Sequence, residues 1–489
     1  MKKSVLLAAA FVALIATSCR KIEMDGGGST VVAPPTTPGV QTIILKGRID
    51  KDTVLREGNN YILSGIVYMV NNATMTVQPG VTVKADYTGA NVAALVITRG
   101  AKLVADGTQE KPIVFTSNSP VPRSGDWGGI VLCGKAQVNT AFTGTGGGAG
   151  ILEVEGGINN SFGDGLAGGG ATPNNADNSG ILRYVRIEYA GYAYQPDKEI
   201  NSLTMAAVGS GTVIDYVQVT YAKDDAFEWF GGTVNCKHLI AYKTQDDDFD
   251  SDNGFSGKVQ FGIVLRDSTI ADISRSEAFE SDNDASGSIN SPQTKAVFSN
   301  LTLIGPRATL ANNGNSLYLA AAHVRRNTGI SIYNSVILGW PAGVLIDARN
   351  GRAVELNIID STIRFKNNII AGCGPATGTD VVSYNFIAST ANASLWNADS
   401  VKARFSNATF SNKVLVNVSD ARMIAPFSYS APDFLPFGGS NGNQDILVGA
   451  SFTDPALTSG FNVVKFRGAC DAAGVDAFWW KGWTRFQNN

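Results

Sequence analysis

Short apolar runs separated by polar turns recur along most of this chain, and long amphipathic helical windows are scarce. Examples of these runs are "MTVQPGVTVKA", "AALVITRGAKLVADG", "VQFGIVLRDS" and "ISIYNSVILGW". Short strands that return roughly every 20 to 30 residues are typical of a solenoid. One coil cannot bury its own apolar face, whereas stacked coils share a continuous core. The pattern therefore predicts a stack of β-coils.

Three internal echoes support this stacking. "YVRIEYAG" is repeated as "YVQVTYAK" at an offset of 32 residues, and "FDSDNG" returns as "FESDND" at an offset of 30. "DDAFEWFGG", which begins at Asp224, matches "DDDFDSDNG", which begins at Asp246, at an offset of 22. Offsets near one coil place the acidic runs above one another on one edge, with Phe227 and Phe249 as inward-facing anchors. A β-sandwich array, the alternative fold, would not produce such echoes.

Several longer segments resemble those of a known family. The opening coils hold "MTVQPGVTVKA", "KPIVFTS" and "DWGGIVLCGKA", and the likeness continues through "LRYVRIEYAG", "AFEWFGGTVN", "DDDFDSDNGFSGKVQFG" and "FRGACDAAGVDAFWWKGWTRF". These segments resemble exported right-handed parallel β-helix lipoproteins of Gram-negative bacteria, which commonly follow the pectin-lyase-like architecture. The resemblance implies an all-β fold, a right-handed parallel β-helix solenoid, over nearly all of the mature chain. It implies little about activity, because most members have no assigned activity.

The β-helix domain is expected to occupy residues 42–489. Within it, the Gly-rich stretch 143–180 is interpreted as a long excursion from the solenoid, and loops of that length are usually functional or irregular. The region 430–489 is expected to form a C-terminal cap, because the aromatic run "FWWKGWTRF" at 478–486 would cover the apolar face of the last coil. A sugar-stacking platform is the alternative interpretation of these aromatic residues.

The N-terminus has the pattern of an export signal. Met1 and two lysines precede the short apolar run "SVLLAAAFVALIA" and then "TSC", which ends at Cys19. This order predicts a secretory signal peptide over residues 1–18. The segment resembles a bacterial lipoprotein signal, in which Cys19 would carry the lipid; an ordinary signal peptide with an incidental cysteine is the alternative. Residues 19–41, rich in Gly, Pro, Ser and Thr, predict a flexible tether. The expected location is the outer membrane, on its cell-surface or periplasmic face.

Composition narrows the choice of partners. Net charge is −3 and no basic run is present, which argues against nucleic acid. Gly-rich phosphate-binding fingerprints are missing, which argues against nucleotides. The membrane is expected as a partner only through the lipid anchor, and the protein is expected to be a monomer. Cys133, Cys236, Cys373 and Cys470 are widely spaced, so two disulfides and buried free thiols both remain open.

The densest acidic stretch, "TQDDDFDSDNGFSG", suggests calcium. Alternate aspartates followed by Gly254 resemble a calcium loop, although Gly is one position late for an EF-hand and Val259 stands where a glutamate is needed. The stacked coils would therefore have to complete the site, and a solvated acidic edge is the alternative. The predicted calcium ligands are Asp224, Asp225, Glu228, Asp246, Asp247, Asp248, Asp250 and Asp252.

The same edge could carry chemistry on polysaccharides. In a calcium-dependent lyase an arginine would take the α-proton of a uronate, and Arg266, Arg325 and Arg326 are candidate bases. In a glycoside hydrolase two carboxylates would flank the bond, and Asp250 is a candidate. The two histidines, His238 and His323, are expected to be structural or exposed, because no catalytic motif surrounds them.

A non-catalytic role is the principal expectation. The protein would bind or display a glycan at the envelope, with calcium stabilising the acidic edge, and fold alone does not decide between these roles. Trp127, Tyr192 and Trp229 are the candidates for stacking on sugar rings, although each could instead pack in the core.

Overall fold

The computed structural model describes residues 39–195, 198–312, 314–374, 383–389 and 396–486. The predicted signal peptide, Cys19 and nearly all of the predicted tether lie outside the described residues. None of the helices within the described ranges has the length and apolar character that a membrane span requires.

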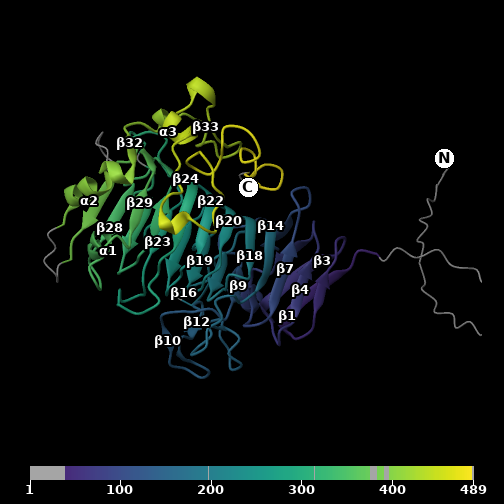
Figure 1. The fold of residues 1–489 in the computed structure, drawn as a ribbon. Coiled ribbons are helices and arrows are strands. Elements are labelled where there is room, and N and C mark those ends of the chain that lie inside the picture. Colours follow the sequence, from purple (N-terminus) through teal and green to yellow (C-terminus); the bar gives the residue numbers. More distant parts are fainter. Residues whose placement is uncertain (1–38, 196–197, 313, 375–382, 390–395, 487–489) are drawn as a thin grey trace, which may run out of the picture. The chain divides into compact units, whose positions relative to one another are not determined.

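Parallel strands stacked coil upon coil form the body of the protein, and 26 strands belong to one hydrogen-bonded system (Figure 1). The strand pairings divide this system into three sides. The stack begins with β1 (Thr42–Ile49) and β3 (Asn60–Met69), which pair with each other and lead into the later coils. The first side contains β2 (Thr53–Leu55), β4 (Thr74–Val77), β7 (Lys102–Asp106), β26 (Ser331–Tyr333), β29 (Arg364–Lys366) and the first halves of the long strands β14 (Gly180–Glu188), β18 (Val213–Thr220), β20 (Cys236–Tyr242), β22 (Lys258–Leu265) and β24 (Val297–Ile304).

The second side contains the second halves of those long strands together with β5 (Thr82–Ala85), β8 (Ile113–Ser117), β27 (Val336–Leu338), β30 (Ile369–Ala371) and β32 (Lys413–Leu415). The third side contains β6 (Ala94–Ile97), β9 (Ile130–Cys133), β17 (Leu203–Ala206), β19 (Phe227–Phe230), β21 (Phe249–Asp252), β23 (Phe279–Ser281), β25 (Ala322–Arg325), β28 (Val344–Asp347) and β31 (Tyr384–Ile387). Because the chain visits the three sides in the same order, the prediction of an all-β parallel β-helix solenoid is confirmed.

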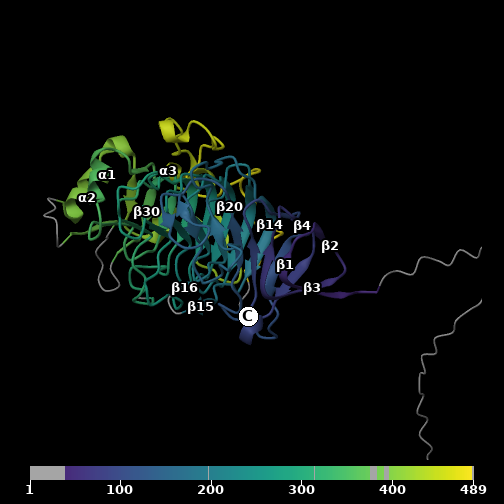
Figure 2. The same ribbon diagram turned by 90° about the horizontal axis from the view of Figure 1, so that it is seen from below.

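The remaining elements are short. Two-stranded antiparallel sheets are formed by β10 (Ala141–Phe142) with β11 (Gly148–Ala149), β12 (Leu152–Glu153) with β13 (Leu166–Ala167), β15 (Ala193–Gln195) with β16 (Lys198–Glu199), and β33 (Met423–Ala425) with β34 (Asp433–Pro436). The α-helices are α1 (Glu355–Ile359), α2 (Ala398–Phe405) and α3 (Gln444–Leu447). Single 3-10 turns lie at Gly89–Asn91, Ala408–Phe410, Val418–Ala421, Gly439–Asn441 and Pro455–Leu457. Figure 2 shows the stack from below, with β1 and β3 at one end and α1 and α2 at the other.

Aromatic side chains stack from coil to coil inside the solenoid. Phe227 lies 5.7 Å from Phe249 and Phe249 lies 5.4 Å from Phe279, measured between ring centroids, and all three rings are buried. Register places these residues directly opposite one another in β19, β21 and β23. The predicted inward-facing anchor and the offsets of 22 and 30 residues are therefore confirmed.

The corner between the first and second sides carries a second ladder, on the outside. Tyr184, Tyr216, His238 and Phe261 all adopt positive φ, between 50° and 64°, which turns the strand at this corner. Their rings stack with centroid separations of 4.5, 4.1 and 5.0 Å. Because the alternation of the strand breaks at this corner, these rings lie outside the main core and need another cover.

The C-terminal segment supplies that cover. Trp479 and Trp483 meet the outer ladder edge-on, and Trp483 is fully buried. Arg186 and Gln218 donate hydrogen bonds to backbone oxygens of this segment, so it runs back along the flank of the solenoid (Figure 1, yellow). The predicted aromatic cap thus covers a side of the stack rather than the last coil, because the unpartnered apolar surface lies on the side.

Helix α2 covers the last coil instead. Val401 and Phe405 of this helix are buried, and the Phe405 ring lies 5.7 Å from Phe365 in β29 and 5.8 Å from Tyr384 in β31. The carboxamide of Asn397 caps the helix by accepting the backbone N–H of Ser400.

The Gly-rich excursion between β9 and β14 is ordered and packs on the outer face of the third side. Val154 and Ile158 join a buried cluster with Val131 and Phe230, and the Tyr68 hydroxyl donates to the Ile158 carbonyl at 2.6 Å. The excursion therefore forms a wall beside the third side. Elsewhere in the described chain, the cysteines Cys133, Cys236, Cys373 and Cys470 are free and buried.

Candidate functional site

Outward-facing positions of the third side form an in-register row of ionisable residues. Glu228 of β19 lies opposite Asp250 of β21, Asp250 lies opposite Glu280 of β23, and Glu280 lies opposite His323 of β25. Adjacent parallel strands are about 4.8 Å apart, so each side chain in the row is within reach of the next. The solenoid thereby assembles one site from residues that are almost 100 positions apart in sequence.

A second acidic row lies at the turn that enters the third side. The backbone N–H of Asp247 donates to Asp225 Oδ1 at 2.9 Å, and the backbone N–H of Glu277 donates to Asp247 Oδ1 at 2.6 Å. Asn201 begins the row by accepting the N–H of Asp225 at 3.1 Å. Each of these side chains fastens the next coil, so the row holds the turns in register while presenting its remaining oxygens outward.

The two rows line a pocket of about 320 Å³. Twelve acidic residues and three arginines face it, so negative charge dominates strongly. The acidic residues are Glu155, Glu199, Asp224, Asp225, Glu228, Asp246, Asp247, Asp250, Asp252, Glu277, Glu280 and Asp282, and the arginines are Arg275, Arg325 and Arg326.

Burial and mutual repulsion disfavour the charged form of these carboxyls. Burial, followed by the charges of neighbouring acidic groups, raises the pKa of Asp225, Glu228 and Asp250 well above the usual carboxyl range. Burial and the charge of Asp282 raise the pKa of Asp252 to about 8. A cation held between the carboxylates would relieve both effects.

Two overlapping sets of carboxylates are spaced to share a cation. One oxygen from each of Asp225, Glu228 and Asp250 lies within 4.8 Å of the other two, and Asp224, Asp225 and Asp246 form a second such set. Oδ1 of Asp250 is buried and accepts no hydrogen bond from any described residue. The donor atoms are all carboxylate oxygens, which are the ligands that calcium prefers. The residues thus fit a calcium ion by chemistry and by spacing.

The far end of the pocket carries the positive charge. Arg325 bonds Glu280 and Asp282, and Arg326 contacts Asp282 at 2.8 Å. Although burial opposes it, the charges of Glu280 and Asp282 raise the pKa of Arg325 above its already high ordinary value. For Glu280, burial would raise the pKa, but the neighbouring His323 and the charge of Arg325 lower it overall.

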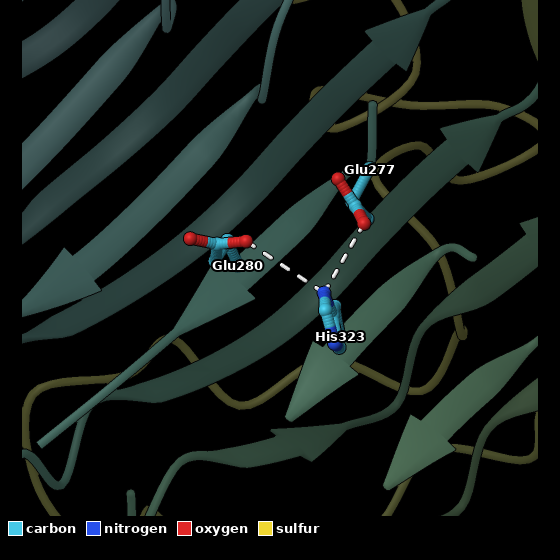
Figure 3. A group of neighbouring side chains, drawn as sticks. All are labelled: Glu277, Glu280 and His323. Carbon is cyan, nitrogen blue, oxygen red and sulfur yellow. Dashed lines mark ion pairs between the residues drawn. The ribbon is translucent and has the colours of Figure 1, made fainter. Parts of the chain in front are cut away.

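His323 lies buried among three carboxylates at this same end (Figure 3). Its Nδ1 is 3.2 Å from Glu277 Oε1 and 3.6 Å from Glu280 Oε2, and its Nε2 is 3.0 Å from Asp347 Oδ2. Burial alone would lower the pKa of His323, but the hydrogen bond with Asp347 and the other carboxylates raise it to about 11.

The prediction that Asp248 binds the cation and that Arg266 faces it is wrong. The register that pairs Phe227, Phe249 and Phe279 places Asp248 in the position held by Ala226 and Ala278, which face the core. Asp248 therefore points inward, where Arg266 Nη1 donates to it at 3.0 Å. Neither side chain has exposed surface, so Arg266 cannot take a proton from a substrate in the pocket.

The stacking prediction is wrong for two of its three residues. The indoles of Trp127 and Trp229 are fully buried in the core, because both side chains alternate inward in their coils. Tyr192 is half-buried and its ring packs edge-on against Tyr194, 4.9 Å away.

Of the predicted ligands, seven line the pocket and only Asp248 does not. Six further residues in or beside the pocket were not predicted from the sequence as part of a site: Glu155, Glu199, Glu277, Glu280, Asp282 and His323. The echo "FESDND" was the signal for Glu280 and Asp282, since its offset of 30 residues is the observed register.

The sequence matches one family over most of its length. The profile of the pectate-lyase-like beta helix domain matches residues 47–413. This range contains the whole pocket and nearly all of the coils, and it ends before the segment that covers the flank. The match fits a right-handed parallel β-helix. Among curated proteins, no sequence matches this chain.

Proposed function

The chain belongs to the pectate-lyase-like β-helix domain family, and on this premise we propose that it is a calcium-dependent glycan-binding protein of the cell envelope. One observation carries the proposal: the two overlapping carboxylate sets, built around Asp225, in a pocket with twelve acidic residues and three arginines. Calcium would offset the repulsion within these sets, and its remaining coordination positions would take carboxylate or hydroxyl oxygens of an acidic glycan.

The firmly protonated guanidinium of Arg325 favours binding over lyase chemistry. A lyase base must lose its proton in order to take one from the substrate. Glu280 and Asp282 bond the Arg325 guanidinium and raise its pKa, which opposes that step. Arg266 is sealed in the core with Asp248. The arginines of the pocket are thus better suited to holding carboxylates in place than to proton transfer.

The envelope location rests on Cys19, which lies outside the described residues. A lipid on Cys19 and the tether that follows it would attach the β-helix to a membrane without any spanning segment. Replacing Cys19 with serine should move the protein from the membrane fraction to the soluble fraction after export. Retention of the Cys19→Ser protein in the membrane fraction would remove this part of the proposal.

Calcium binding is tested by thermal unfolding of protein stripped with a chelator. Calcium at about 100-fold above its Kd should stabilise the native protein by roughly 2.7 kcal/mol and raise Tm by a few degrees. Asp250→Asn should reduce this calcium-dependent rise, because it replaces one carboxylate of the set that Asp225, Glu228 and Asp250 form. Asp106→Asn, at a pair with Arg183 that is about 40% exposed, is the matched control and should leave the rise unchanged. A wild-type Tm that does not respond to calcium would contradict the proposal.

Glycan binding is tested on immobilised polygalacturonate. Wild-type protein should be retained in calcium and released by chelator, whereas Asp250→Asn should be retained less. The absorbance of unsaturated uronate ends should not increase during the experiment. An increase would identify the protein as a lyase, and equal retention with and without calcium would exclude calcium bridging.

A further inference from the structure

We propose that Glu277, Glu280 and His323 form a second metal site, which takes a transition-metal dication such as Zn²⁺ rather than calcium. One donor atom from each residue lies within 4.8 Å of the other two. The site goes beyond the proposed calcium function, because its ligands, its chemistry and its preferred metal all differ.

The fold places the three residues by register. Glu280 in β23 lies directly opposite His323 in β25, and Glu277 stands at the turn just before β23. The exposed fraction is 1% for Glu277 and 3% for His323. Figure 3 shows both carboxylates directed toward the same ring nitrogen of His323. The three side chains therefore converge on one point that is largely shielded from water.

Two of the converging atoms lack hydrogen-bond partners among the described residues. These atoms are Nδ1 of His323 and Oε1 of Glu277. They lie 3.2 Å apart without the angles of a hydrogen bond. Leaving buried polar atoms unpaired is costly, so such atoms usually have an additional partner such as an ion. A metal between Nδ1 and the two carboxylates would satisfy both atoms.

The opposite side of the imidazole is built like the outer shell of a metal site. Nε2 of His323 lies 3.0 Å from Asp347 Oδ2, which fixes the ring's orientation. Asp347 is in turn held by Arg349, whose Nε donates to it at 2.9 Å and whose backbone N–H donates at 3.0 Å. With the Nε2 proton held by a carboxylate, Nδ1 is the nitrogen that can bind a metal, which takes the place of the Nδ1 proton.

The donor set separates this metal from calcium. One imidazole nitrogen with two carboxylates suits zinc and neighbouring transition metals, whereas calcium takes oxygen ligands. None of the three ligands belongs to the carboxylate sets built around Asp225. Three protein ligands also leave a coordination position for water or for a ligand in the pocket, which Glu277 and Glu280 line.

Cobalt titration of the full-length protein, made without an affinity tag and stripped of metal, tests the proposal. Co²⁺ should bind with one equivalent and give visible d–d absorption bands, and Zn²⁺ should displace it while excess Ca²⁺ should not. His323→Gln should weaken Co²⁺ binding at least 100-fold. Asp347→Asn keeps all three ligands and should weaken it 10- to 100-fold through the imidazole.

The chain offers a matched control, because His238 is its only other histidine. His238→Asn should bind Co²⁺ like wild type, and Asn is the residue that Asn300 and Asn334 supply at the same corner of later coils. Circular dichroism establishes that each variant is folded; if His323→Gln unfolds, the folded Asp347→Asn protein decides. Absence of the bands in wild type, full affinity in the decisive variant, or displacement of Co²⁺ by Ca²⁺ would overturn the proposal. Asp250→Asn separates it from the calcium proposal, since that variant should respond less to calcium and bind Co²⁺ like wild type.

Discussion

The Arg266 guanidinium donates to the Asp248 carboxylate at 3.0 Å in a part of the core where neither side chain has any exposed surface. The same coil position holds Ala226 and Ala278 in the neighbouring coils. The charged pair therefore lies at a position where the other coils bury a small apolar side chain. Burial raises the pKa of Asp248 to about 6 even though Arg266 opposes that shift. Each of the two charges is tolerated in the core only because the other is present, since a single unpaired buried charge destabilises the folded state far more.

Arg266→Met should therefore destabilise the protein by about 3–5 kcal/mol, because it leaves Asp248 buried without its partner. Urea unfolding at pH 7 measures the change. Lys111→Met is the matched control, since Lys111 pairs with Glu57 at 2.9 Å where both side chains are more than half exposed. The free energy of unfolding of the control should fall by less than about 1 kcal/mol. Equal losses in the two variants would contradict the assignment of Arg266 to the core.

Trp483→Ala should destabilise the protein by about 3–5 kcal/mol, because the buried indole covers Tyr184 and Tyr216. Limited proteolysis should also release the C-terminal segment faster than in wild type. Phe478→Ala, at a ring that is 45% exposed in the same segment, should cost under about 1 kcal/mol. A Trp483 variant as stable and protease-resistant as wild type would show that the flank needs no cover.

The four described cysteines should be unreactive until the protein unfolds. Burial raises the pKa of Cys133 and Cys373 to about 12, and all four thiols are buried. In protein carrying Cys19→Ser, a thiol reagent at pH 8 should label none of them in the native state and all four in guanidinium chloride. Unfolded protein that shows no thiols would mean that disulfides form after all.

Asp454→Asn should destabilise the protein at pH 7 but not at pH 2. Burial would raise the pKa of Asp454, but the hydrogen bond with Lys366 and the charge of Arg364 lower it overall. A lowered folded-state pKa adds stability that is complete above the unfolded value of about 3.9 and is lost as pH falls through the folded value. Asn keeps the side-chain oxygen that caps the turn at Ala456, so only the charge is removed.

Urea unfolding of the wild-type and Asp454→Asn proteins across this pH range measures the difference in the free energy of unfolding. About 1–3 kcal/mol is expected at pH 7, shrinking toward zero below pH 3. A difference that does not depend on pH would mean that packing, and not the ion pairs with Arg364 and Lys366, is responsible.

Sequence echoes predicted the stacking well because the solenoid repeats its register. Asp224 to Asp252 could be aligned across two coils, and the pairing of Glu228 with Asp250 follows from that alignment. Asp248 was predicted to face outward because it alternates with Asp250 in sequence. Alternation applies only within a strand, and Asp248 lies at the corner before β21, which begins at Phe249. The alignment of Asp248 with Ala226 was the signal that its side chain turns inward.

The His323 end of the pocket was not predictable in the same way. His323 lies 43 residues after its partner Glu280, because two long loops separate β23 from β25. No fixed period survives such insertions, so the sequence offers no spacing that joins the two residues. The side position of the C-terminal aromatic residues was missed for a related reason: the outer ladder exists only because Tyr184 and its equivalents adopt positive φ.

The segment after β32 returns along the flank and contacts coils that come far earlier in the sequence. Gln109 Nε2 donates to the Lys481 carbonyl at 2.8 Å across 372 residues of chain. A chain that stopped at β32 would keep all of its coil-to-coil pairing, yet Tyr216 and Phe261 would meet water. The early coils therefore keep an apolar stripe exposed until residues 478–486 have packed against them, so the folding chain needs protection from aggregation during that interval.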